Sequence, residues 1–106
     1  MVSIAPDHGG VGTVVVIKGS GFEPRSNLRA SICAVDAKGN VPNYFLNCDL
    51  GNTVPTTADS VGYVAVSFTV KSIPHAISGG GYHIGLGPLT GPDPSNDGGA
   101  AFSVDR

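Results

Sequence analysis

The strongest constraint on the fold is the alternation of apolar and polar residues in short runs separated by turn residues. It is clearest at residues 63–70, where Val64, Val66, Phe68 and Val70 share one parity and smaller or polar residues occupy the other. A period of two is that of a β-strand with one buried face, so these four side chains are predicted to point into a core. Residues that favour helices are scarce, since glutamate occurs once and glutamine is absent. A helical fold is therefore excluded.

Comparable runs predict the other strands and the residues that face the core. We expect strands at residues 2–4, 13–18, 28–35, 44–50, 53–57, 82–86 and 102–104, and turns at residues 7–10 and 36–40. The other residues expected in the core are Val15, Ile17, Phe22, Leu28, Ala30, Ile32, Ala34, Tyr82, Ile84, Leu86, Phe102 and Val104. About seven antiparallel strands with turns at this spacing are typical of an immunoglobulin-like Greek-key β-sandwich, and residues 1–106 are expected to form one such domain.

Cys33 and Cys48 are the two cysteines of the chain, so they allow one intramolecular disulfide. Cys33 has the parity of the outward face of its strand, and residues 44–50 could return antiparallel to that strand and bring Cys48 opposite Cys33. The alternative is two buried free thiols. A bridge would close a loop of ~15 residues and stabilise the fold by about 3 kcal/mol in the chain-entropy model. A composition rich in Gly, Ser, Thr and Val and poor in Lys and Glu also suits an exported bacterial domain.

No arrangement of residues predicts catalysis. Ser20 lies between two glycines, but the spacing and the following helix of a nucleophile elbow are missing. His8, His75 and His83 are isolated and lack the spacing of metal ligands. We therefore expect no enzymatic activity, no catalytic residue and no cofactor.

One segment is similar to the beginning of a calcium-binding loop. Residues 93–98 match D-x-S-x-D-G, which places oxygen ligands at alternate positions. The twelfth position is Val104, where a calcium loop has an acidic residue that binds through both oxygens. An ordinary turn is therefore predicted here, and no metal site is expected.

Charge and hydropathy limit the partners. The formal net charge is −2 and 13% of the residues are charged. The chain therefore lacks the positively charged surface that would attract nucleic acids or anionic membranes. No apolar run approaches the ~18 residues of a membrane span. Met1 leads directly into a strand-like segment, so we expect a secreted or extracytoplasmic protein whose signal peptide has been removed.

Several segments resemble known bacterial domains. Residues 4–22 resemble the beginning of bacterial immunoglobulin-like domains of both the IPT/TIG type and the neocarzinostatin type. The rest is more similar to the neocarzinostatin family of secreted actinobacterial proteins. Residues 31–34 with Asn47-Cys48 resemble its first disulfide hairpin, residues 57–70 its following turn and strand, and residues 83–86 and 98–104 its last two strands. The resemblance covers nearly the whole chain.

This resemblance implies a carrier function. Members of the family hold an apolar enediyne chromophore in a cleft formed by the outer face of a sheet and its hairpins, and the chromophore damages DNA while the protein carries it. The positions here that correspond to the cleft are Ser31, Val35, Leu46, His83, Gly85 and Gly87. Tyr44 and Phe45 lie near the predicted disulfide hairpin, where they could form an exposed contact patch or pack against the neighbouring sheet.

Two features differ from the family pattern. Residues 71–81 replace a longer hairpin that carries a second disulfide and lines one wall of the cleft, and Val35 stands where a large aromatic residue is expected. Without that wall and base, a pocket should bury too little of a drug-sized ligand. The leading hypothesis is a non-enzymatic exported module for structural spacing or for contact with a protein or cell-surface partner. The alternative is a carrier that binds a small apolar ligand.

Overall fold

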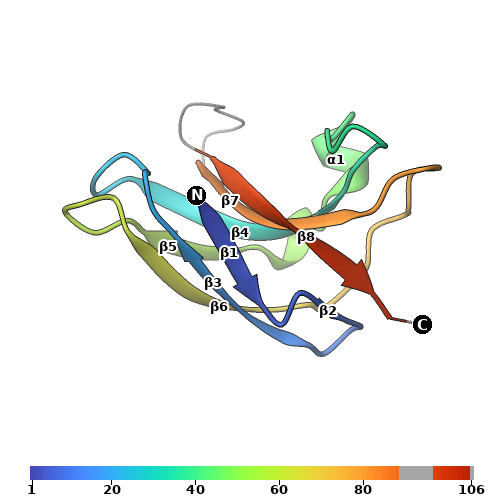
Figure 1. Ribbon diagram of the computed structural model, residues 1–106, viewed down its shortest axis with the longest axis horizontal. Coiled ribbons are helices and arrows are strands. Elements are labelled where there is room, and N and C mark those ends of the chain that lie inside the picture. The colour runs from blue at the N-terminus through green and yellow to red at the C-terminus, as the bar shows by residue number, and fades with distance from the viewer. Residues whose placement is uncertain (89–96, 106) are drawn as a thin grey trace.

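Two β-sheets pack face to face in the computed structural model, which describes residues 1–88 and 97–105 (Figure 1). The strands are β1 Val2–Ala5, β2 His8–Gly9, β3 Val14–Gly19, β4 Asn27–Ala34, β5 Val54–Thr57, β6 Val64–Thr69, β7 Tyr82–Pro88 and β8 Gly98–Val104. A short α-helix, α1 Tyr44–Asn47, and a 3-10 helix, η1 Leu50–Asn52, lie between β4 and β5. The predicted class, an all-β immunoglobulin-like sandwich, is confirmed.

The two sheets differ in size. One has three strands in the order β1-β3-β6, and the other has five in the order β2-β8-β7-β4-β5. All strand pairs are antiparallel except β2 and β8, which are parallel. In Figure 1, α1 lies above the side of the larger sheet that faces away from the smaller one.

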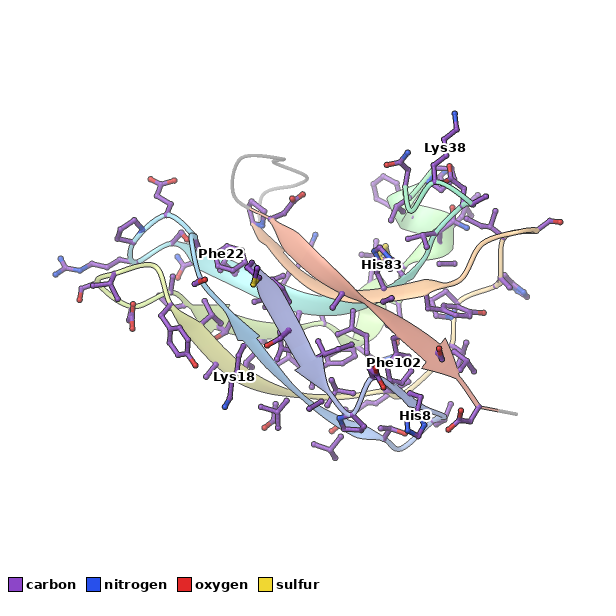
Figure 2. The ribbon with its side chains drawn as sticks, viewed as in Figure 1. His8, Lys18, Phe22, Lys38, His83 and Phe102 are labelled. Carbon is purple, nitrogen blue, oxygen red and sulfur yellow. A yellow bond between two sulfur atoms is a disulfide. The ribbon has the colours of Figure 1, made fainter. Side chains whose placement is uncertain are left out.

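The core lies between the inner faces of the two sheets, as the alternation predicts. Phe68 of β6 is 1% exposed, and the inward residues of β3, β4 and β7 are also buried. Val66 and Val104 are partly buried and pack against this cluster. Figure 2 shows Phe22 and Phe102 between the two layers. Each buried aliphatic or aromatic side chain contributes about 1.5–3 kcal/mol through removal of apolar surface from water.

Residues 44–50 do not form the predicted strand. They contain α1, and the only antiparallel bridge in this segment among the described residues joins Cys33 and Cys48. The side chain of Asn43 accepts hydrogen bonds from the backbone N–H groups of Phe45 at 2.9 Å and Leu46 at 3.3 Å. This is the contact of a helix N-cap, and it offers the backbone a local alternative to a β-ladder. The expected hairpin is therefore wrong.

The turn predicted at residues 7–10 contains strand β2. His8 and Gly9 lie beside Ser103 and Val104 in parallel. The backbone N–H of Ser103 donates to the carbonyl of Asp7 at 2.9 Å, and that of Asp105 donates to the carbonyl of Gly9 at 2.8 Å. A strand of two residues is too short to show alternation, so the sequence pattern could not reveal it.

Candidate functional site

The outer face of the five-stranded sheet carries a regular set of small and polar residues from β4, β7 and β8. All of them have the parity that points away from the core. The strand register aligns them in three rows across the sheet: Arg29–Gly87, Ser31–Gly85–Gly99 and Cys33–His83–Ala101.

Gly85 and Gly87 leave the middle of this face without side chains, and the space around the two positions differs. A Cβ atom at position 85 would lie 2.5 Å from the carbonyl oxygen of Gly98, so β8 is too close for any side chain there. At position 87 the nearest atom among the described residues would be the Cβ of Asp97 at 3.7 Å, which is an ordinary contact distance. The backbone of β7 is therefore bare at positions 85 and 87, and position 87 has room for a Cβ atom.

Residues 36–52, called the wall segment here, rise from the end of β4 beside this face. The segment begins with a turn in which the Asp36 carboxylate accepts hydrogen bonds from the backbone N–H groups of Lys38 at 2.9 Å and Asn40 at 3.0 Å. After α1 it returns to β4 at Cys48, which forms a disulfide with Cys33. The predicted bridge is confirmed, although it ties a loop to β4 instead of closing a regular hairpin.

A cleft of about 810 Å³ lies between the wall segment and the sheet. The sheet contributes Arg29, Ser31, Cys33, His83, Gly85, Leu86, Gly87 and Pro88. The wall segment contributes residues 39–43, Phe45, Cys48 and Leu50, and residues 97–99 form a further part of the rim. Pockets for drug-sized ligands typically have volumes of ~300–1,000 Å³, so the cleft is large enough for such a ligand.

A second, smaller cavity of about 310 Å³ adjoins the cleft. Gly39 and His83 line both cavities, so the two meet at these residues. The smaller cavity also contains Val35 and residues 79–82. In Figure 2, His83 projects from the larger sheet on the side that bears the wall segment, with Lys38 further out.

The structure brings four of the six expected ligand-site residues into the cleft. They are Ser31, His83, Gly85 and Gly87. Val35 is 4% exposed and lines the smaller cavity. Leu46 is 72% exposed and is not among the residues that line either cavity. Leu46 was expected on a strand of the predicted hairpin, but this segment forms α1.

Other lining residues were not predicted from the sequence. Arg29 has the same parity as Ser31, so the alternation of β4 was a signal that could have revealed it. Residues 39–43 and Asp97 reach the cleft from segments outside the strands, which carry no periodic signal, whereas Gly98 and Gly99 lie at the start of β8. Phe45 is 86% exposed and lines the cleft, so packing against the sheet does not account for it. The side chain of Tyr44 lies outside the described part of the structure.

Among the described residues, three with ionisable side chains line the cleft: Arg29, His83 and Asp97. Arg29 is half-buried, and it forms no ion pair with another residue of ranges 1–88 and 97–105. Within those ranges the ion pair joins His8 Nδ1 and Asp105 Oδ2 at 2.9 Å. This hydrogen bond raises the pKa of His8 above the ordinary value of 6.5, with a smaller contribution from the charge of Asp105.

The described ranges contain neither a cluster of metal-binding side chains nor a membrane-spanning helix. No group of three or more histidine, cysteine, aspartate or glutamate side chains there could hold a metal ion. Most of the calcium-like string at residues 93–98 lies outside the described residues. No helix in residues 1–88 and 97–105 combines the length and the apolar character needed to cross a bilayer.

Comparisons with known proteins identify the family. The chain matches the Neocarzinostatin family over residues 2–90. It resembles the structure of macromomycin with 20% identity and a TM-score of 0.70, over 99% of this chain and 98% of that one. It also resembles the solution conformation of apokedarcidin with 24% identity and a TM-score of 0.57, over 99% and 97% of the two chains. No curated protein sequence matches. The two structures support the fold, and the family match, which covers most of the chain, shows that it belongs to the Neocarzinostatin family.

Proposed function

We propose that this protein is a secreted, non-enzymatic carrier that binds a small apolar ligand of the chromophore type in the cleft. The observation that carries the proposal is the open cleft of about 810 Å³ on the outer face of β4 and β7. It lies where the family resemblance expects a ligand. The disulfide between Cys33 and Cys48 suits the oxidising environment outside the cytoplasm.

The lining of the cleft suits a flat apolar ligand. Phe45 presents an aromatic ring that is 86% exposed, and covering it would contribute roughly 25 cal/mol for each Å² removed from water. The bare backbone at Gly85 and Gly87 lets a ligand approach the sheet closely. The Ser31 hydroxyl and the His83 imidazole supply the few polar groups that orient a ligand in such pockets.

The wall segment supplies a side of the cleft that the shortened residues 71–81 were expected to leave open. Residues 71–81 are short, but the disulfide holds residues 36–52 against β4, where they line one side of the cleft. Val35, in place of the large aromatic, lines the adjoining cavity. A spacer or surface-interaction module needs no cleft of this kind, and the family match favours the carrier.

A substitution that fills the cleft tests the proposal. N-phenyl-1-naphthylamine is an uncharged aromatic probe whose fluorescence rises in apolar pockets, and we expect saturable binding of one probe per protein. Gly87→Val should weaken this binding at least about tenfold, or about 1.4 kcal/mol, because the new side chain occupies the cleft floor. Position 87 has room for a Cβ, so the melting temperature should stay within a few degrees.

Ala65→Val is the matched control. Ala65 is exposed on β6, in the other sheet, and adding the same side chain there should leave probe binding unchanged. Absence of saturable binding to the wild-type protein would contradict the proposal, as would equal binding by Gly87→Val. Native mass spectrometry of protein purified from its own host should show an added mass that is lost on denaturation.

A further inference from the structure

Arg29 stands at one end of the cleft, in a position that the carrier function by itself does not explain. A neutral ligand offers the guanidinium group no acidic oxygens to bind. The side chain comes from β4 in the row next to Ser31, and its neighbour across the strand pair is Gly87. Because Gly87 has no side chain, the cleft stays open beside Arg29.

No acidic side chain of the described residues forms an ion pair with Arg29. The residue is half-buried. A charge that is partly removed from water interacts more strongly with an opposite charge than an exposed one does. The planar guanidinium also presents several N–H donors in a fixed arrangement that matches two acceptor oxygens of an acidic group.

We propose that the ligand of this cleft is an apolar ring system that carries an anionic group, and that Arg29 binds that group. This inference rests on the proposed carrier function and names the chemical class of its ligand. The rings lie over the bare backbone of Gly85 and against Phe45, and the acidic oxygens accept hydrogen bonds from Arg29. Arg29 is thus the residue that distinguishes an acid from a neutral molecule of the same shape.

Asp97 is the acidic side chain that lines the same end of the cleft, so its effect must be weighed. A Cβ at position 87 would lie 3.7 Å from the Asp97 Cβ, which places Asp97 on the side of Gly87 that faces β8. Asp97 is exposed and Arg29 is half-buried. Water and salt screen the exposed carboxylate more than the half-buried guanidinium, so attraction by Arg29 dominates at the cleft floor.

Two dyes with one ring skeleton separate the charge from the shape. 8-Anilinonaphthalene-1-sulfonate carries a sulfonate that N-phenyl-1-naphthylamine lacks. Fluorescence titrations would give the dissociation constants of both dyes for the wild-type protein, Arg29→Gln, Arg29→Lys and Lys18→Gln at low and high salt. Lys18 is exposed on β3 of the other sheet, so Lys18→Gln removes one positive charge far from the cleft (Figure 2).

Arg29→Gln should weaken binding of the sulfonate dye about tenfold, because a charge-assisted hydrogen bond is lost, and change binding of the neutral dye less than about twofold. Arg29→Lys should restore part of the loss, and Lys18→Gln should alter neither constant. High salt should weaken the sulfonate dye selectively. Equal losses for both dyes, no loss for either, or an equal effect of Lys18→Gln would overturn the role of Arg29. Failure of the wild-type protein to bind either dye would instead contradict the carrier function itself.

Discussion

The two sheets contribute similar inner faces to one core, but their outer faces differ. On the three-stranded sheet, β3 and β6 present an outer row of ordinary side chains that includes Val16, Lys18 and Ala65. On the five-stranded sheet, glycines interrupt the row and the wall segment stands beside it, so this face encloses a cleft. The comparison shows that side chains in alternation build the stable core, whereas missing side chains and an irregular loop build the candidate site.

The largest effect should come from the shared inner face. Phe68→Ala removes a side chain that is 1% exposed, and we expect it to lower the free energy of unfolding by about 3–5 kcal/mol through lost burial and a cavity. Val16→Ala, on the outer face of the same sheet, should cost less than about 1 kcal/mol. Urea denaturation of both variants measures the contrast, and similar losses would contradict the assignment of inner and outer faces.

Removal of the disulfide should affect both the stability of the sandwich and ligand binding in the cleft. The double variant Cys33→Ala/Cys48→Ala should lower the free energy of unfolding by about 3 kcal/mol in the chain-entropy model, without abolishing the fold, because the core of the two sheets is independent of it. Probe binding in the cleft should weaken as well, since Cys48 anchors the wall segment to β4.

Urea denaturation and titration with N-phenyl-1-naphthylamine test the two effects separately. Ala65→Val serves again as a control with an intact disulfide. Unchanged probe affinity in the double variant would show that the wall segment keeps its position without the bridge. An unchanged free energy of unfolding would show that the bridge contributes nothing to the sandwich.

The smallest expected effect on stability comes from the ion pair of His8 and Asp105, beside β2. β2 follows β1 of the small sheet but pairs with β8 of the large one, and His8 there binds Asp105. The pKa of His8 is raised above 6.5, mainly by this hydrogen bond. The pair therefore stabilises the fold fully below pH ~6.5, and its contribution is lost as the pH rises through the raised value.

The free energy of unfolding of His8→Gln relative to wild type measures this contribution at pH 5.5 and pH 8.5. We expect the deficit of the variant to be larger at pH 5.5. In an Asp105→Asn background the same substitution should show no such pH dependence. A deficit that grows with pH would contradict the direction of the pKa change.

The sequence allowed the core to be predicted almost completely, because burial on one face of a strand imposes a period of two on its side chains. Val64 and Ile84 are buried for this reason. The cleft was only partly predictable. Parity put Ser31, Gly85 and Gly87 on the outward face, and the family resemblance put them in a cleft. Residues 39–43 and Phe45 reach the cleft through a turn and a helix that depend on the side chains of Asp36 and Asn43. Such local contacts leave no repeating pattern.

The closure of the wall segment by one disulfide has a consequence for how this scaffold can vary. Cys33 and Cys48 are 15 positions apart in sequence, yet their Cα atoms lie 4.0 Å apart. To the sandwich, residues 36–47 are an insert that the disulfide closes, so their number and chemistry can change while β4 keeps its pairing with β7. The entropic cost of a longer insert grows only slowly with its length. Exchanging this insert is thus a direct route to carriers with differently shaped clefts on one unchanged frame.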